Sequence, residues 1–282
     1  MSISQSAIHN PQFPAWRLLI TEPASGARNM AVDEAIATLS AFGESPPTLR
    51  FYQWRPGTVS LGRHQPLADV DLTRIAQQGY DVVRRATGGR AILHIDELTY
   101  SIAGPQTEPR FNGAILDSYN RLSEGLLLGL QRLGVDAVKA PAGNRSGSDA
   151  GPVCFEVPSA YEIVVAGRKL IGSAQSRRAG YVLQHGSLPL RGDIARLVDV
   201  LAVTDEGERT TLRRALLGRA TTVEQALGRH VSFWEAATVL VDGFTSALNI
   251  DLEEGELSPT EATLVAELEA EKYGSADWLE RI

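Results

Sequence analysis

Apolar and polar positions along the chain divide it into short strands and a few helices. Runs that are β-branched, or that alternate between apolar and polar residues, predict strands. These runs cover 16–21, 49–54, 58–61, 81–85, 91–94, 98–103, 135–140 and 181–190. Apolar residues at three- and four-residue steps from Ile115 to Leu133 predict a long amphipathic helix, and shorter helical patterns cover 29–42 and 69–78. Strands interleaved with helices predict an α/β or α+β fold with a mixed sheet flanked by helices.

A β-hairpin is predicted in the middle of the chain. Residues 161–166 include three β-branched residues in a row and stop at Gly167, which suits a tight turn, and 169–176 return as the second strand. The stretch before the hairpin, 141–152, has a glycine at every fourth position from Gly143 and little apolar surface. We expect that stretch to be mobile when no ligand is bound.

The C-terminal part of the chain carries clear signals for helix starts. A Ser or Thr is followed three residues later by Glu or Gln, the capping-box pattern, at 222–225, 232–235 and 258–261. We therefore expect a main domain over 1–250 and a short helical tail over 251–282.

Composition limits the functions to consider. The chain has 282 residues, 43% of them apolar and 22% charged, as in ordinary globular proteins. A net charge of −7 argues against a nucleic-acid partner. No stretch, residues 1–14 included, has the apolar length of a signal peptide or a membrane span, so we expect neither secretion nor membrane insertion. The one cysteine, Cys154, cannot form an internal disulfide and fits a reducing cytoplasm.

A glycine loop between two predicted strands is the first candidate for ligand binding. Residues 84–90 read Arg-Arg-Ala-Thr-Gly-Gly-Arg. Glycines in such a loop let backbone N–H groups approach a ligand, and the arginines suit a phosphate or a carboxylate. The loop matches neither the dinucleotide-binding pattern nor Walker A, and an ordinary hairpin turn explains it equally well.

Cys154 and Lys169 are the second candidate, for nucleophilic chemistry. A thiol reacts as the thiolate, and a nearby ammonium group lowers its pKa. Lysine, unlike arginine, can also release its proton near neutral pH. Lys169 is one of three lysines among 27 basic residues, which makes its position notable. The pattern alone leaves open that Cys154 is a buried apolar residue.

Histidines and arginines surround both candidates. His94 and His185 lie at loop ends in the two candidate stretches and could line one pocket, although a structural role is the more common one for either residue alone. No two histidines have the spacing of a zinc motif, so we expect no metal. Six arginines are expected to make the mouth of the site attractive to an acidic partner: Arg84, Arg85, Arg90, Arg168, Arg177 and Arg178.

Short motifs occur together over nearly the whole chain. They are Asn29-Met30-Ala31 with Asp33-Glu34, Leu49-Arg50-Phe51-Tyr52 with Trp54, Ser60-Leu61-Gly62-Arg63 with Gln65, Arg84-Arg85 with Thr87-Gly88-Gly89-Arg90-Ala91, Leu93-His94, Cys154-Phe155, Pro158-Ser159 with Tyr161-Glu162, Lys169 with Gly172-Ser173-Ala174-Gln175, and Gln184-His185-Gly186-Ser187. Together they resemble the lipoate–protein ligase and octanoyltransferase family, most closely octanoyltransferases of the LipM type. The glycine loop followed by the lysine–glycine hairpin is specific for the superfamily. A cysteine fifteen residues before that lysine selects the transferase branch.

The resemblance implies a fold like the biotin/lipoate protein ligase catalytic domain and a reaction without ATP, other cofactors or a metal. An octanoyl group would move from acyl carrier protein to a lysine of a lipoyl domain, such as glycine cleavage H protein, through a thioester on Cys154. Lys169 would lower the pKa of that thiol and later handle the proton of the incoming amine. The substrate-binding residues that the resemblance implies are Arg84, Arg85, Thr87, Gly88, Gly89, Arg90, His94, Gly172, Ser173, Ala174, His185 and Gly186.

Three other functions stay open. An ATP-dependent lipoate–protein ligase would share the glycine loop and would use Lys169 to bind acyl-adenylate, but it would leave Cys154 idle. An amidotransferase that moves octanoate between lipoyl domains would also work through a cysteine thioester. A non-catalytic module that binds acyl carriers or lipoyl domains would need neither Cys154 nor Lys169.

Overall fold

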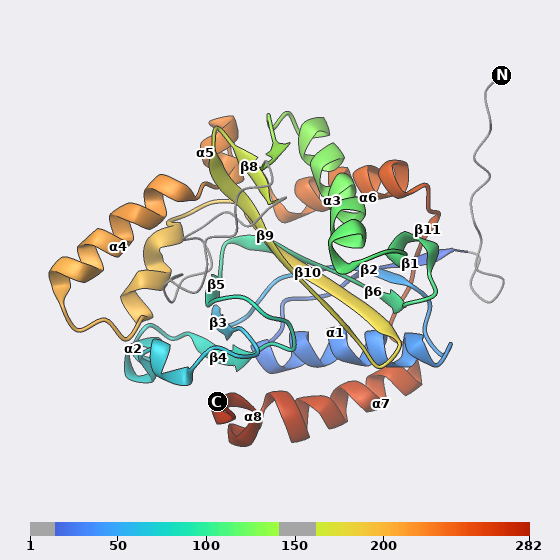
Figure 1. Ribbon diagram of the computed structural model, residues 1–282, viewed down its shortest axis with the longest axis horizontal. Helices are drawn as coiled ribbons and strands as arrows, with labels where there is room; N and C mark the ends of the chain where they lie inside the picture. The colour runs from blue at the N-terminus through green and yellow to red at the C-terminus, as the bar shows by residue number, and fades with distance from the viewer. Residues whose placement is uncertain (1–14, 141–161) are drawn as a thin grey trace.

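The structure, a computed structural model, describes residues 15–140 and 162–282 and is built on one large mixed β-sheet. Its eight strands lie in the order β11 (Leu252–Glu254), β1 (Trp16–Ile20), β2 (Thr48–Tyr52), β6 (Glu97–Pro105), β10 (Tyr181–Pro189), β9 (Arg168–Arg178), β8 (Ile163–Val165) and β7 (Val138–Lys139) (Figure 1). β1 pairs in parallel with β11 and β2, and the pairings from β2 to β7 are antiparallel. The predicted mixed sheet is confirmed.

The predicted hairpin is present as β8 and β9. Val165 pairs with Arg168 across the turn at Gly167, and the pairing continues to Ile163 opposite Ile171. β9 then runs on to Arg178, two residues beyond the predicted end, and pairs along this length with β10. The long β9–β10 ladder therefore carries the residues of the hairpin into the centre of the large sheet.

A smaller sheet holds the glycine loop. Its strands are β4 (Asp81–Arg84), β3 (Thr58–Leu61) and β5 (Ile92–His94), with β3 in the middle, parallel to β4 and antiparallel to β5. Apolar residues of this sheet pack with α2 (Leu72–Gln77), the 3-10 helix η3 (Ile194–Val200) and α4 (Glu206–Arg219). Because the glycine loop joins β4 to β5, the small sheet fixes both of its ends.

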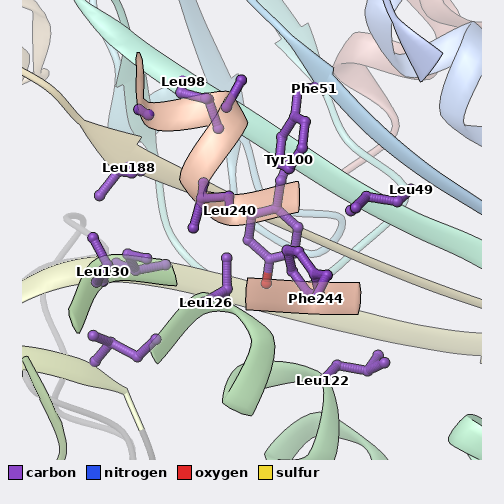
Figure 2. Close-up of a cluster of buried hydrophobic side chains, with 14 of the residues drawn as sticks. Leu49, Phe51, Leu98, Tyr100, Leu122, Leu126, Leu130, Leu188, Leu240 and Phe244 are labelled. Atoms are coloured by element: carbon purple, nitrogen blue, oxygen red, sulfur yellow. The ribbon is translucent and has the colours of Figure 1, made fainter. Parts of the chain in front are cut away.

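Two helices, α3 (Ile115–Arg132) and α6 (Phe233–Leu248), cover one face of the large sheet. Leu126 and its neighbours on α3 meet Leu240 and Phe244 of α6, and these side chains pack with Phe51 and Tyr100 of the sheet (Figure 2). The helix backbones approach so closely that a Cβ on Gly243 would lie 2.4 Å from the carbonyl oxygen of Gly125. Glycine is therefore a steric requirement of this contact.

The opposite face is covered by α1 (Gly26–Ala41), which the C-terminal helices cover in turn (Figure 1). The hydroxyl of Ser25 accepts a hydrogen bond from the Arg28 N–H, so α1 begins three residues before the predicted Asn29. α7 (Pro259–Leu268) and the π-helical turn η4 (Glu269–Tyr273) pack on α1, and α8 (Ala276–Glu280) reaches β4. The tail is thus part of the layered structure around the site.

The predicted helix starts in the C-terminal part are confirmed. Ser258 and Glu261 form a reciprocal capping box at α7, and Thr222 and Ser232 cap α5 (Val223–Leu227) and α6. The tail also contributes β11, whose Leu-Glu-Glu sequence carries no strand signal. Within 15–140 and 162–282, no helix is long and apolar enough to cross a membrane.

Replacing Gly243 by alanine tests the close packing of α3 and α6. The new Cβ would overlap the Gly125 carbonyl and the Gly129 backbone. We expect the free energy of unfolding to fall by about 1–3 kcal/mol because the helices must separate, although alanine alone favours a helix interior by about 1 kcal/mol. Gly218→Ala in α4, where a Cβ meets no atom within 4 Å, is the matched control and should be neutral or stabilising. Urea unfolding measures both variants, and equal effects of the same sign would contradict this packing.

Candidate active site

The candidate site lies on the face of the large sheet that α1 covers. Side chains on a strand point alternately to its two faces. On β6 the even-numbered residues from Leu98 to Ile102 enter the core under α3 and α6, so Thr99 and Ser101 point toward α1. Residues that pair with Thr99 and Ser101 on the neighbouring strands point to the same face and form two rows across four strands. The first row is Arg50, Ser101, His185 and Ala174, and the second is Tyr52, Thr99, Ser187 and Gly172. Polar groups buried in these rows need partners inside the protein.

Asp33 of α1 supplies the partner for the first row. Its carboxylate accepts hydrogen bonds from Arg50 Nη1 at 2.7 Å, Ser101 Oγ at 2.8 Å and Tyr52 OH at 2.9 Å, and it lies 3.4 Å from His185 Nδ1. Burial alone would raise the pKa of Asp33, but the Arg50 guanidinium and the hydrogen bonds from His185 and Ser101 outweigh it, so the pKa lies below its ordinary value. One carboxylate therefore ties α1 to β2, β6 and β10.

His185 continues this network to the glycine loop. Burial lowers the pKa of His185 in spite of the neighbouring Asp33, so the ring is neutral at pH 7. An ionised Asp33 can only accept, which assigns the ring proton to Nδ1. Nε2 then accepts a hydrogen bond from the Thr87 hydroxyl at 2.6 Å. The predicted residues Thr87 and His185 are thus in direct contact and fix the loop against β10.

The glycine loop is held from within by the two arginines that precede its glycines. Arg85 donates to carbonyl oxygens of the loop and of β3, on Gly88, Arg90 and Ser60. Arg84 donates to three other carbonyl oxygens, on Gly62, Gln65 and Leu279. Both guanidinium groups are buried. The expectation that these two arginines belong to a positive rim is therefore wrong, because their charge is used to hold the backbone.

A close backbone contact explains two glycines of the motifs. A Cβ on Gly62 would lie 1.9 Å from the carbonyl oxygen of Gly89. Gly89 itself has a φ of 99°, a conformation that L side chains rarely adopt. The loop therefore takes its shape only with glycine at both positions.

A second buried chain of hydrogen bonds passes through His94. Ser60 Oγ lies 2.8 Å from His94 Nε2, and His94 Nδ1 lies 2.7 Å from Glu97 Oε1. Glu97 also accepts hydrogen bonds from the hydroxyl groups of Thr99 and Ser187. The Trp54 ring stacks on the His94 ring with centroids 4.0 Å apart. His94 is thus fixed at both nitrogens and on one ring face.

Lys169 and Glu162 form an ion pair beside the hairpin. Lys169 Nζ lies 2.5 Å from Glu162 Oε1, and the two side chains are 1% and 5% exposed. Gly172 leaves room for the lysine, since a Cβ there would lie 3.2 Å from Nζ. Two opposite charges at this depth stabilise each other, and removal of either partner would leave the other uncompensated. The ammonium group is therefore held in place beside the backbone of Gly172.

A pocket opens between the two sheets next to Gly172. Its volume is about 450 Å³, which includes the solvent-filled space at its opening. Nine of the twelve predicted binding residues line it: Arg85, Gly88, Gly89, His94, Gly172, Ser173, Ala174, His185 and Gly186. Met30, Tyr52, Trp54 and Ile92 add apolar surface. The pocket is therefore suited to a narrow apolar group whose end reaches the glycine loop and Gly172.

The other predicted residues lie around the pocket or outside the described part of the chain. Cys154 and the stretch 141–152 lie outside the described residues. Arg90 is 3.8 Å from Asp69. Of the remaining predicted arginines, Arg168 and Arg177 donate to groups of the protein itself, and Arg178 donates to the carbonyl oxygen of Ala86 in the glycine loop.

Three acidic residues of the site are absent from the predicted binding set: Asp33, Glu97 and Glu162. Asp33 and Glu162 occur within the motifs, but their roles come from contacts with partners on other elements. One sequence signal could have identified such residues. It is a charged residue at a position that the hydrophobic pattern predicts to be buried, such as Asp33 in the largely apolar α1. A buried charge of this kind marks a site or a structural ion pair.

Comparisons with known proteins agree on the family and the fold. The model of the lipoyl protein ligase A/B catalytic domain matches residues 25–245. The chain is 42% identical to octanoyltransferase LipM of Kyrpidia tusciae over 93% of this chain and 97% of that protein. It is 36% identical to octanoyltransferase LipM of Staphylococcus aureus over 94% and 98%.

Solved structures show the same architecture. A bipartite lipoate protein ligase from Thermoplasma acidophilum, solved in a study of its lipoylation system with an E2 lipoyl domain, has a TM-score of 0.79 at 27% identity and covers 95% of this chain and 97% of its own. A lipoate-protein ligase A bound with ATP has a TM-score of 0.77 at 27% identity, over 94% and 98%. The predicted biotin/lipoate ligase-like fold is confirmed.

The pH dependence of stability tests the neutral state assigned to His185. Because burial lowers its folded-state pKa, the unfolded chain binds this proton first as the pH falls below about 6.5. The stability present above that pH is then lost as the pH falls. Asp33, whose pKa is also lowered, adds to the loss only below its ordinary value of 3.8.

Denaturant unfolding between about pH 7 and pH 5 measures this contribution. We expect the free energy of unfolding to decrease over this range in the wild type and to decrease less in His185→Gln. His230→Gln changes an exposed histidine and should keep the wild-type slope. A His185→Gln profile parallel to the wild-type profile would show that His185 is not held neutral by burial.

Proposed function

The chain belongs to the lipoyl protein ligase A/B catalytic domain family, and we propose that it transfers an octanoyl group to a lysine of a lipoyl domain through a thioester on Cys154. The family resemblance of the motifs is confirmed, and the relatives that match nearly the full chain at 36–42% identity are octanoyltransferases. The observation that carries the proposal in the structure is the Lys169 ammonium, buried against Gly172 where Gly172 lines an apolar pocket.

The pocket supports the choice of an aliphatic acyl group. Met30, Trp54 and Ile92 line it together with backbone of the glycine loop and of β9. Each methylene that leaves water for such surroundings contributes about 0.8 kcal/mol, so an eight-carbon chain gains several kcal/mol. The buried hydrogen-bond chains through His94 and His185 satisfy the polar groups of the pocket wall and keep it in one shape.

The first half of the reaction forms the enzyme thioester. The Cys154 thiolate attacks the carbonyl carbon of the octanoyl thioester on acyl carrier protein, a new C–S bond forms, and the carrier thiolate leaves and takes up a proton. One thioester replaces another, so the step needs no ATP. Backbone N–H groups of the glycine loop or of β9 stabilise the oxyanion of the tetrahedral intermediate.

The second half passes the acyl group to the lipoyl domain. The neutral amine of the acceptor lysine attacks the Cys154 thioester, the C–N bond forms, and Cys154 leaves as a thiolate. In our proposal Lys169 stabilises this thiolate and takes part in transfer of the amine proton, which arginine could not do near neutral pH. Glycine cleavage H protein is the proposed acceptor, and a reducing cytoplasm is the proposed setting because it keeps Cys154 as a thiol.

The alternative is an ATP-dependent ligase. The solved structures with the same fold include ligases, one of them bound with ATP. The octanoyltransferase reading is preferred because the relatives of higher identity carry that name over almost the whole chain. An amidotransferase that uses a lipoyl domain as donor shares the cysteine chemistry and differs only in the first substrate.

Incubation with octanoyl acyl carrier protein in the absence of ATP tests the proposal. Mass spectrometry should show one octanoyl adduct on the wild-type protein, removable by hydroxylamine and missing from Cys154→Ala. Addition of a lipoyl domain should move the adduct to that domain. Octanoylation of the lipoyl domain only with ATP and free octanoate would establish the ligase instead. A lipoyl domain that alone serves as octanoyl donor would establish the amidotransferase.

Substitution of Lys169 separates its two proposed roles. Lys169→Ala should raise the pKa of the Cys154 thiol, and each unit of increase lowers iodoacetamide alkylation near pH 7 by about tenfold. Lys169→Arg keeps the positive charge, so it should retain more of the thiol reactivity while it loses octanoyl transfer to the acceptor amine. Lys139→Ala removes a lysine paired with Glu124 away from the pocket and is the control. Alkylation rates that are the same in Lys169→Ala and wild type would remove Lys169 from activation of the thiol.

A further inference from the structure

Four cations gather where the C-terminal tail meets the glycine loop. We call Arg63, Arg178, Lys272 and Arg281 the tail cluster. The backbone N–H of Arg63 donates to the carbonyl oxygen of Thr87 at 2.8 Å, so Arg63 lies directly against the loop. Arg178 donates to the carbonyl oxygen of Ala86 in the same loop at 2.7 Å. Arg63 therefore contacts the loop through its backbone, and Arg178 contacts it through its guanidinium group.

Trp278 brings the other two cations of the tail cluster to the loop. Lys272 Nζ and Arg281 Cζ lie 4.2 Å and 4.4 Å from the centroid of the Trp278 ring. The Trp278 indole N–H donates to the carbonyl oxygen of Arg84 at 2.7 Å, and Arg84 in turn donates to the carbonyl oxygen of Leu279. The tail is thus fixed to the strand that leads into the glycine loop (Figure 1).

Among the described residues, Glu34 is the one carboxylate that forms an ion pair with the tail cluster, through Lys272. The carboxylate of Glu34 is bonded to Lys272 at 2.5 Å and to the hydroxyl of Tyr273. The Arg63 guanidinium donates no hydrogen bond to any described residue, and its Nε is buried. Burial and the nearby Arg178 and Arg281 lower the pKa of Arg63. An arginine held among other arginines without an acceptor is prepared for an anion from outside the chain.

We propose that the tail cluster binds the phosphate ester of the acyl donor, the phosphate of a phosphopantetheine arm. This inference rests on the proposed function, since it names the part of the thioester donor that the cluster contacts. Arg178 follows Gly172 on the same extended strand, at a separation of about 20 Å at 3.3 Å per residue. A donor whose thioester lies at Gly172 must therefore be long, as a phosphopantetheine arm is.

The shape of the tail cluster favours a phosphate over the carboxylates of a carrier's surface. Arg63 is half-buried, so a compact group on a flexible arm reaches it more readily than side chains on a folded surface. The planar guanidinium group binds two phosphate oxygens at once, and several such groups share one phosphate. Carrier-bound and coenzyme A-bound acyl groups both have this phosphate, which makes the inference testable with small donors.

The test compares octanoyl-4′-phosphopantetheine with octanoyl-pantetheine, which lacks only the phosphate. Rates of octanoyl adduct formation on the full chain give kcat/KM for each donor. We expect the ratio of the two values to fall at least tenfold in Arg63→Gln and in Arg281→Gln, which corresponds to about 1.4 kcal/mol. Arg214→Gln changes an exposed arginine on α4 and should keep the wild-type ratio.

Binding without turnover provides a second measurement. Calorimetric titration with 4′-phosphopantetheine and with pantetheine should show tighter binding of the phosphorylated compound by the wild type and a loss of that preference in Arg63→Gln. This binding measurement reports on the tail cluster even if no octanoyl adduct forms. Failure of the proposed reaction and failure of the phosphate site are therefore distinguishable.

Two results would overturn the inference. Equal losses with both donors would mean that the cluster only holds the glycine loop in shape. A loss confined to octanoyl acyl carrier protein, with both small donors unaffected, would mean that the cluster contacts the protein surface of the carrier instead of the phosphate.

Discussion

Two buried ion pairs border the pocket, and its shape depends on both. Asp33 holds Arg50 and contacts His185 of the pocket wall, and Glu162 holds Lys169 next to Gly172 of the pocket wall. Removal of one partner from such a pair costs about 3–5 kcal/mol because the other charge is left in a poorly solvating interior. Each pair therefore fixes the elements that carry it: α1 against the large sheet, and the start of β8 against β9.

The two pairs differ in what they leave for chemistry. Arg50 also donates to Asn29 and Thr21 and is surrounded by groups of the protein, so its role is to position α1 and, through Asp33, His185. Lys169 lies beside Gly172, whose backbone forms part of the pocket wall. Similar ion pairs thus produce one structural centre and one candidate reactive centre, according to what lies next to the cation.

Sequence patterns predicted the parts of the site that local interactions determine. The β-branched run ending at Gly167 predicted the hairpin, and two glycines between strands marked a candidate binding loop, which borders the pocket. Arg84 and Arg85 show the limit of such reasoning. Their chemistry suits an anion, but their guanidinium groups bind backbone carbonyls, and the residue type alone cannot distinguish the two uses.

Long-range contacts could not be predicted in the same way. Glu34 and Lys272 are separated by 238 positions, and Arg63 acquires its surroundings only when the tail returns to the glycine loop. The three-residue strand β11 is chosen by its pairing with β1 and has no intrinsic signal. These features depend on tertiary packing, which no local sequence pattern encodes.

The central claim is that Glu162 holds Lys169 as a buried ammonium group beside the pocket. The most direct measurement is a ¹⁵N NMR spectrum of protein labelled at the side-chain nitrogens of its three lysines. At pH 7 we predict an ammonium signal for Lys169 that exchanges slowly with water and that shifts in Glu162→Gln, while the signals of Lys139 and Lys272 stay in place. A neutral-amine signal for Lys169 at pH 7, or an ammonium signal indifferent to Glu162→Gln, would contradict the account.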